Sequence, residues 1–147
     1  MSISRELNIG RAGEYLVLAD LLLKGYQTFD GGQGVDYDVV LEDKNRKLIK
    51  IQVKTTTKPV KHGNSTQFVY FFNIKRNGKH GMRRYSDSDF DIYALVMLDI
   101  RQIAYLVNKN INNTLILRNK NLKYRNEINA RYFQDLTLEK ALKELEV

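Results

Sequence analysis

Apolar residues recur at helical spacing through the first two dozen positions of the chain. A period of three to four residues is typical of an amphipathic helix, which here would begin near Ser4 or Asn8 and end at Lys24, before Gly25. The apolar positions that would form its buried stripe are Ile9, Ala12, Leu16, Ala19 and Leu23. Asp20 and Lys24 fall on the opposite side of the helix, so we expect them to face solvent.

The rest of the chain carries short runs that alternate in polarity or are rich in β-branched and aromatic residues, both typical of strands. These predicted strands cover residues 26–29, 37–42, 48–56, 67–74, 91–98 and 103–107, with a further short one at 114–117. The polar turn 43–47 joins the second and third into a β-hairpin, whereas the glycine-punctuated segment 75–84 is predicted to be a loop or distorted turn. With an amphipathic helix at 137–145, the order of elements predicts an α/β domain with a mixed central β-sheet flanked by helices.

The length and composition limit the kind of protein this chain can be. With 147 residues, 43% of them hydrophobic, it can bury a core, and we expect a single domain over residues 1–147. The absence of cysteine excludes disulfides and thiolate metal sites, and two histidines far apart in sequence argue against a zinc site. The most apolar run, 94–98, is too short to span a membrane, and the N-terminus lacks the apolar stretch of a signal peptide, so we expect a cytoplasmic protein.

Polar side chains gather on one face of the predicted hairpin. Because side chains alternate between the faces of a strand, matching the apolar face of 37–42 to that of 48–56 places Asp38, Gln52 and Lys54 together on the other face. Cross-strand neighbours lie roughly 5 Å apart, so these groups can share one site. Asp36 has the same parity as Asp38 and competes with it, although it also fits a turn residue after Gly34.

Glu14 in the first helix has an unusual position for a carboxylate. It projects with Val17 and Leu21 rather than with the polar residues, so the helix holds it against an apolar or half-buried face. A charge placed there needs a partner, such as a metal ion or a lysine. A salt bridge to Arg11 or Lys54 would be a purely structural explanation. Nearby glycines, Gly10 and Gly13, would let another backbone or a nucleic acid approach closely.

Phosphodiester hydrolysis is the chemistry that uses these residue types. Carboxylate and amide oxygens bind hard cations such as Mg²⁺ or Mn²⁺, and Mg²⁺ usually contacts substrate phosphate directly. A lysine beside the metal can orient the attacking water or stabilise the growing negative charge. Glu14, Asp38, Gln52 and Lys54 supply these roles without histidine or cysteine.

The segments GRAGEYLVLADLLLKGY (10–26), YDVV (37–40) and IQVKTT (51–56) together resemble the PD-(D/E)XK nucleases. More narrowly, they are similar to group I intron homing endonucleases that carry glutamine in place of the second acid. The resemblance implies a restriction-endonuclease-like core. It also implies roles for four residues, in which Glu14 is the helix glutamate, Asp38 the metal-binding aspartate, Gln52 the variant metal ligand and Lys54 the catalytic lysine. The chain departs from the family pattern in lacking a proline before the aspartate, and a neutral Gln52 adds no negative charge for the metal.

Positive charge is in excess and is concentrated after the hairpin. Lys plus Arg outnumber Asp plus Glu by 24 to 17, which gives a net charge of +7 and attracts polyanions. The basic residues that we expect to contact DNA are Lys58, Lys61, Lys75, Arg76, Lys79, Arg83 and Arg84. His62 follows Lys58 and Lys61 and can extend the same track. A solvated loop is the ordinary alternative for such a run, and a lone histidine in a basic loop, such as His80, is not expected to act as a general base.

The sequence therefore predicts a Mg²⁺- or Mn²⁺-dependent endonuclease for double-stranded DNA, acting as a homodimer or homotetramer because one active site cuts one strand. Three alternatives are open. A nuclease selective for four-way DNA junctions would use the same core. A catalytically inactive DNA-binding module would bind DNA with steep salt dependence and would not cut it. In a structural or interaction protein, Glu14, Asp38 and Lys54 would merely neutralise one another.

Overall fold

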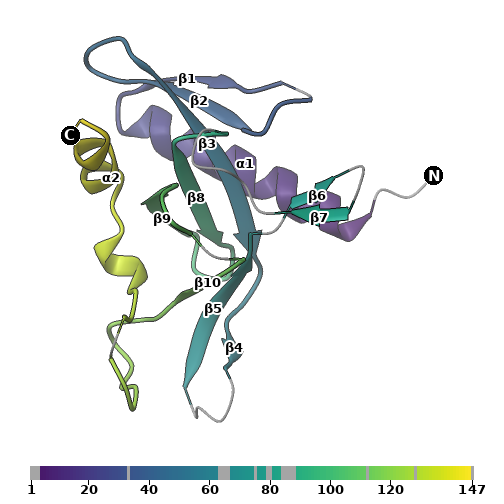
Figure 1. Cartoon of the computed structure of the whole chain (residues 1–147), viewed down its shortest axis with the longest axis vertical. Coiled ribbons are helices and arrows are strands. Elements are labelled where there is room, and N and C mark those ends of the chain that lie inside the picture. The colour runs from purple at the N-terminus through teal and green to yellow at the C-terminus, as the bar shows by residue number, and fades with distance from the viewer. Residues whose placement is uncertain are drawn as a thin grey trace.

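A computed structural model of the chain describes residues 4–32, 34–62, 67–74, 76–78, 81–83, 89–111, 113–127 and 129–146, of which 76–78 and 81–83 are described by their backbone alone. Two α-helices and ten strands lie within these ranges (Figure 1). The helices are α1 (Arg5–Leu23) and α2 (Leu138–Leu145), and a 3₁₀ turn, η1 (Phe133–Asp135), precedes α2. The strands are β1 (Gln27–Asp30), β2 (Val39–Glu42), β3 (Leu48–Thr56), β4 (Val60–Lys61), β5 (Phe68–Asn73), β6 (Arg76–Gly78), β7 (Gly81–Arg83), β8 (Ile92–Met97), β9 (Gln102–Val107) and β10 (Thr114–Leu117).

A five-stranded sheet in the order β1-β2-β3-β8-β9 forms the centre of the molecule. Its β3–β8 pair is parallel and the other pairs are antiparallel, so the mixed central sheet predicted from the sequence is confirmed. The hairpin is confirmed as well, because β2 and β3 pair with Val39 opposite Ile51 and Leu41 opposite Ile49. A parallel pair needs a long crossover, and the residues between β3 and β8 provide it.

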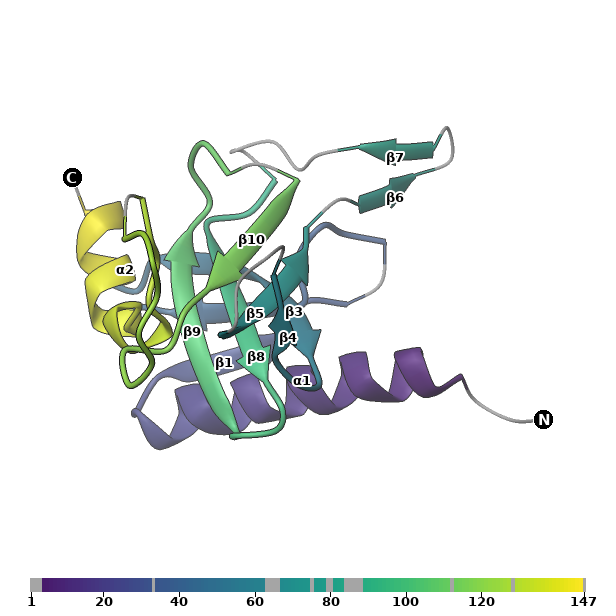
Figure 2. The ribbon, with the colours of Figure 1, turned by 90° about the horizontal axis from the view of Figure 1, so that it is seen from below.

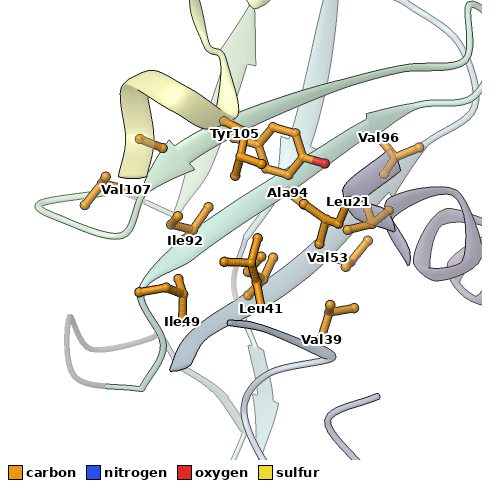
Figure 3. Close-up of a cluster of buried hydrophobic side chains, with 14 residues drawn as sticks. Leu21, Val39, Leu41, Ile49, Val53, Ile92, Ala94, Val96, Tyr105 and Val107 are labelled. Atoms are coloured by element: carbon orange, nitrogen blue, oxygen red, sulfur yellow. The ribbon is translucent and has the colours of Figure 1, made fainter. Parts of the chain in front are cut away.

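The two faces of the central sheet are covered differently (Figure 2). Helices α1 and α2 pack on one face, where Val17 and Leu138 join a cluster with Ile92, Ala94 and Val96 of β8 (Figure 3). The second sheet, β10-β5-β4, covers the other face of β8. All six residues of β8 are buried, which explains why its sequence is a continuous apolar run rather than an alternating one.

The predicted buried stripe of the first helix is wrong at three of its five positions, whereas Leu16 packs partly buried against the core. Helix α1 buries Gly13, Val17 and Leu21, whereas Leu23 is 88% exposed. Ala12 and Ala19, also assigned to the stripe, are exposed. The C-terminal half of the helix is apolar on almost every side, so periodicity does not single out the face that meets the sheet.

Two further differences concern the segments after the hairpin. Part of 75–84, predicted to be a loop, forms the antiparallel pair β6–β7, in which Arg76 is opposite Arg83. Figure 2 shows this pair extending away from the central sheet. The short strand β4 was not predicted, whereas the remaining strands and the helix near the C-terminus lie within two residues of their predicted bounds. Local pattern is least informative for two- and three-residue strands, because so few positions carry the period.

Candidate active site

Asp38 lies directly before β2, at the point where β3 runs on beyond its pairing with β2 while staying paired with β8. Its backbone N–H donates to the Ile51 carbonyl over 2.9 Å. Its carboxylate Oδ2 accepts a 2.9 Å hydrogen bond from the Val53 backbone N–H. The side chain thus takes the place of the main-chain acceptor that a longer β2 would offer to β3. This contact holds the carboxylate at the edge of β3, beside the stretch that carries Gln52.

Gln52 and Lys54 project from β3 on the face opposite Ile51 and Val53, which are in the core. Gln52 is 9% exposed, so its amide is one of the few buried polar groups among the described residues. Lys54 is half-buried, and burial lowers the pKa of its ammonium while the charge of Asp38 opposes that change. The Lys54 ammonium and the Asp38 carboxylate therefore lie within electrostatic range of each other.

Glu14 reaches the same place from helix α1. Burial raises the pKa of its carboxyl group, the nearby Asp38 carboxylate raises it further, and Arg11 opposes both. The pKa of Asp38 is raised by burial. The hydrogen bond between the two carboxyl groups raises the pKa of Glu14 and lowers that of Asp38. Glu14 and Asp38 are therefore in direct contact, and Lys54 lies within electrostatic range of the same Asp38 carboxylate.

Asp30 is a residue of this cluster that the sequence alone did not reveal. Its charge raises the pKa of both Glu14 and Asp38. It ends β1, directly opposite Val39 of β2. Asp30 could have been found by predicting that β1 pairs with β2. The register of two short strands joined through a glycine-rich turn cannot be read from the sequence. Asp36 lies in the bend before Asp38, and Asp38 is the carboxylate whose charge acts on both Glu14 and Lys54.

The donor set suits a hard divalent cation. Two carboxylates and a neutral amide offer only oxygen, which Mg²⁺ and Mn²⁺ prefer. Among the described residues, no group of three or more His, Cys, Asp or Glu side chains could hold a metal ion. Glu14, Asp38 and the neutral Gln52 amide are the oxygen donors that would hold the ion.

The basic residues expected to contact DNA fall into three groups. Lys58 and Lys61 follow β3 and are exposed, as is His62. The Lys61 ammonium lies 5.6 Å from the centre of the Phe68 ring, a cation–π contact. Arg76 and Arg83 belong to β6 and β7. The remaining members, Lys75, Lys79 and Arg84, lie outside the described residues, as does His80.

The chain is similar to one family of known proteins and to solved structures. A family model described as PD-(D/E)XK endonuclease matches residues 5–139. The solved structure of a bacterial homing endonuclease, I-Ssp6803I, matches with a TM-score of 0.66 and 19% sequence identity, over 99% of this chain and 100% of that one. No curated protein matches the chain. The structural likeness shows that the chain has the restriction-endonuclease-like fold expected from the sequence.

None of the helices in the described part of the chain is long and apolar enough to cross a membrane.

Proposed function

Because this chain belongs to the PD-(D/E)XK endonuclease family, we propose that it is a metal-dependent endonuclease that cuts double-stranded DNA at a specific sequence. One observation carries the proposal beyond the family. Glu14, Asp38 and Lys54 come from three separate segments and meet in one partly desolvated cluster at the edge of β3. Clusters in which burial and neighbouring charges shift several pKa values together are typical of catalytic sites.

Each residue has a distinct role in this proposal. Asp38, Gln52 and Glu14 hold the cation, and the backbone N–H of Val53 fixes the orientation of the Asp38 carboxylate. When bound, Mg²⁺ or Mn²⁺ would supply Lewis-acid polarisation of the scissile phosphate. Lys54, with its ammonium beside Asp38, orients the attacking water and stabilises the negative charge that develops on the phosphate. Asp36 is the alternative to Asp38 as the ligand.

The basic residues support a nucleic-acid substrate. The net charge of +7 favours association with a polyanion. Lys58 and Lys61 are exposed a few residues after Lys54 on the same segment, where they can contact the phosphates that flank the scissile bond. A two-stranded ribbon is narrow enough for the major groove, so β6–β7 is the element we expect to read base edges.

Cutting both strands of a duplex requires two active sites with opposite strand polarity. A homodimer with twofold symmetry supplies them, and a homotetramer is a pair of such dimers. The structurally similar I-Ssp6803I is described as a homing endonuclease, which makes homing or restriction the two biological settings we favour.

The proposal is tested by cleavage of a pool of genomic DNA fragments with Mg²⁺, with EDTA, and with the variants Lys54→Ala and Lys50→Ala. Lys50 is the matched control, because it lies on the same strand but is exposed and contacts the Tyr37 ring at 5.2 Å. We expect cutting that requires Mg²⁺, is lost in Lys54→Ala and persists in Lys50→Ala.

Other outcomes identify the alternatives. Cutting of a synthetic four-way junction but not of plain duplex would show a structure-selective nuclease. Salt-sensitive DNA binding without any metal-stimulated cutting would show an inactive binding module. Equal loss of cutting in both lysine variants would contradict the role assigned to Lys54, and no binding or cutting of any DNA would contradict the proposed function.

A further inference from the structure

Helix α1 and strand β3 approach each other most closely at Gly13 and Thr55. A Cβ atom added to Gly13 would lie 1.9 Å from Thr55 Oγ1, 3.0 Å from its Cβ and 3.2 Å from its Cγ2. The first of these distances is far inside van der Waals contact, so any side chain at position 13 would push the helix or the strand away. Gly10, one helical turn earlier, has no atom within 4 Å of the corresponding position.

The Thr55 hydroxyl has an unusual environment for a polar group. Its Oγ1 is buried, and it has no hydrogen-bond partner within the part of the chain that the structure describes. Buried hydroxyls are normally hydrogen-bonded, and one that is not calls for another explanation. Here Oγ1 occupies the space that a Cβ at Gly13 would take, so the side chain of Thr55 acts as a spacer between strand and helix.

The two contacting residues are sequence neighbours of two candidate catalytic residues. Gly13 directly precedes Glu14 on α1, and Thr55 directly follows Lys54 on β3. The separation of a helix from the surface below it depends on the side chains at the contact. The closeness at Gly13 therefore determines how far the Glu14 carboxyl group reaches toward Asp38 at the edge of β3.

We propose that the Gly13–Thr55 contact is a positioning device that holds Glu14 within reach of the Asp38–Lys54 pair and so shapes the cation site. This inference rests on the proposed function. It assigns positioning roles to Gly13 and Thr55, which act through Glu14 and do not themselves touch metal or substrate. Changing a residue that orients a metal ligand typically costs about 10- to 100-fold in metal affinity.

The test compares five full-length proteins in addition to the unmodified chain, each measured for Mn²⁺ affinity by electron paramagnetic resonance and for Tm without metal. The single variants are Gly13→Ala, Gly10→Ala and Thr55→Val. The double variants combine Gly13→Ala with Thr55→Ala, which removes Oγ1 and Cγ2, or with Thr55→Val, which keeps the size of the side chain. Gly10→Ala is the matched control, since alanine there meets open space and favours the helix.

We expect Gly13→Ala to weaken Mn²⁺ binding by about 10- to 100-fold and to lower Tm. Gly10→Ala and Thr55→Val should bind Mn²⁺ as the unmodified chain does. The double variant with Thr55→Ala should recover part of the affinity, because the 1.9 Å conflict with Oγ1 is removed while the Cβ at 3.0 Å remains, whereas the one with Thr55→Val should recover none. If Gly13→Ala fails to fold, recovery of both folding and Mn²⁺ binding in the Thr55→Ala double variant still supports the proposal.

Unchanged Mn²⁺ affinity in folded Gly13→Ala would overturn the inference and leave the nuclease assignment intact. Absence of recovery in the Thr55→Ala double variant would overturn it as well. Failure of the proposed function gives a different result. The unmodified chain would then neither bind Mn²⁺ nor cut DNA, while Gly13→Ala would still have a lower Tm because of the steric contact with Thr55.

Discussion

Two carboxylates of helix α1, Glu14 and Asp20, face the body of the protein but meet different surroundings. The expectation that Asp20 faces solvent is wrong, because it is partly buried and hydrogen-bonded to Tyr105 of β9. Asp20 accepts a 2.7 Å hydrogen bond from the Lys24 ammonium and a 2.6 Å hydrogen bond from the Tyr105 hydroxyl. Glu14 meets the carboxylate of Asp38, with the charge of Asp30 also nearby. Asp20 is hydrogen-bonded to two donors, whereas Glu14 has two carboxylates and the positive charge of Arg11 nearby.

The difference separates a structural carboxylate from a functional one. Asp20 links α1 to β9, and Figure 3 shows the Tyr105 ring within the core with its hydroxyl directed toward α1. Burial, followed by the hydrogen bond to Asp20, raises the pKa of Tyr105, so this hydroxyl stays a donor throughout the physiological range. Burial and the neighbouring Asp38 charge raise the pKa of Glu14, so the charged form of this pair lacks sufficient compensating positive charge, which a metal ion could supply.

Asp38→Asn tests the functional side of the comparison and should have the largest effect. Asparagine keeps a carbonyl oxygen for the Val53 N–H but loses the negative charge. We expect the cleavage rate to fall at least about 100-fold. Changing a residue that only supports a metal ligand already lowers activity by about 10- to 100-fold. Cleavage rate and Tm are measured together, and a variant that keeps full activity would remove Asp38 from the site.

Tyr105→Phe tests the structural side. It removes the donor to Asp20 and leaves the carboxylate with a missing partner. Hydrogen bonds to charged groups contribute about 1.5–3 kcal/mol, so we expect a loss of that order in the free energy of unfolding. Chemical denaturation gives the value, and cleavage per folded molecule should be unchanged. A large loss of activity in the folded variant would mean that the two carboxylates are coupled.

Glu14→Gln should stabilise the metal-free protein while weakening metal binding. The pKa of Glu14 in the folded protein is raised above 4.5, so the folded protein binds more protons than the unfolded chain. Stability is therefore lost as pH rises from 4.5 through the raised pKa. Glutamine removes this penalty, so Tm should exceed that of the unmodified protein at neutral pH by roughly 2–4 °C for each kcal/mol relieved.

The pH dependence provides the control for that variant. The difference in Tm should vanish below the ordinary glutamate pKa of 4.5, where Glu14 is protonated in both states. Metal affinity of the unmodified protein should fall as pH is lowered through the raised pKa, because the cation competes with the proton. A Tm difference that persists at acid pH would point to packing rather than charge.

Lys24→Ala should have the smallest effect. The Lys24–Asp20 ion pair is partly exposed, with side-chain exposures of 35% and 27%, and spans one helical turn. Such pairs contribute about 0.3–0.5 kcal/mol, and salt weakens them. Thermal unfolding at low and high salt should show a small difference that shrinks with added salt. A larger, salt-independent loss would mean that Asp20 depends on Lys24 more than on Tyr105.

Much of the sheet and part of the candidate site could be predicted from residues alone. Alternation in β2 and β3 identified the hairpin and the apolar face formed by Val39, Leu41 and Ile51, because a period of two directly encodes which face is buried. The position of Glu14 beside Val17 and Leu21 similarly marked it as facing inward. Parity placed Asp38 on the face of Gln52 and Lys54, but Asp38 precedes β2 and its carboxylate lies at the edge of β3.

The sequence by itself determined the strands of the central sheet, the two helices and the residue types available for chemistry, since each depends on local period and composition. The tertiary structure alone decided which side of the apolar helix α1 is buried, that Asp30 joins Asp38 across the β1–β2 pair, and that Gly13 meets Thr55. These three features depend on how elements far apart in sequence dock, and docking is set by the fit of whole surfaces rather than by any local repeat.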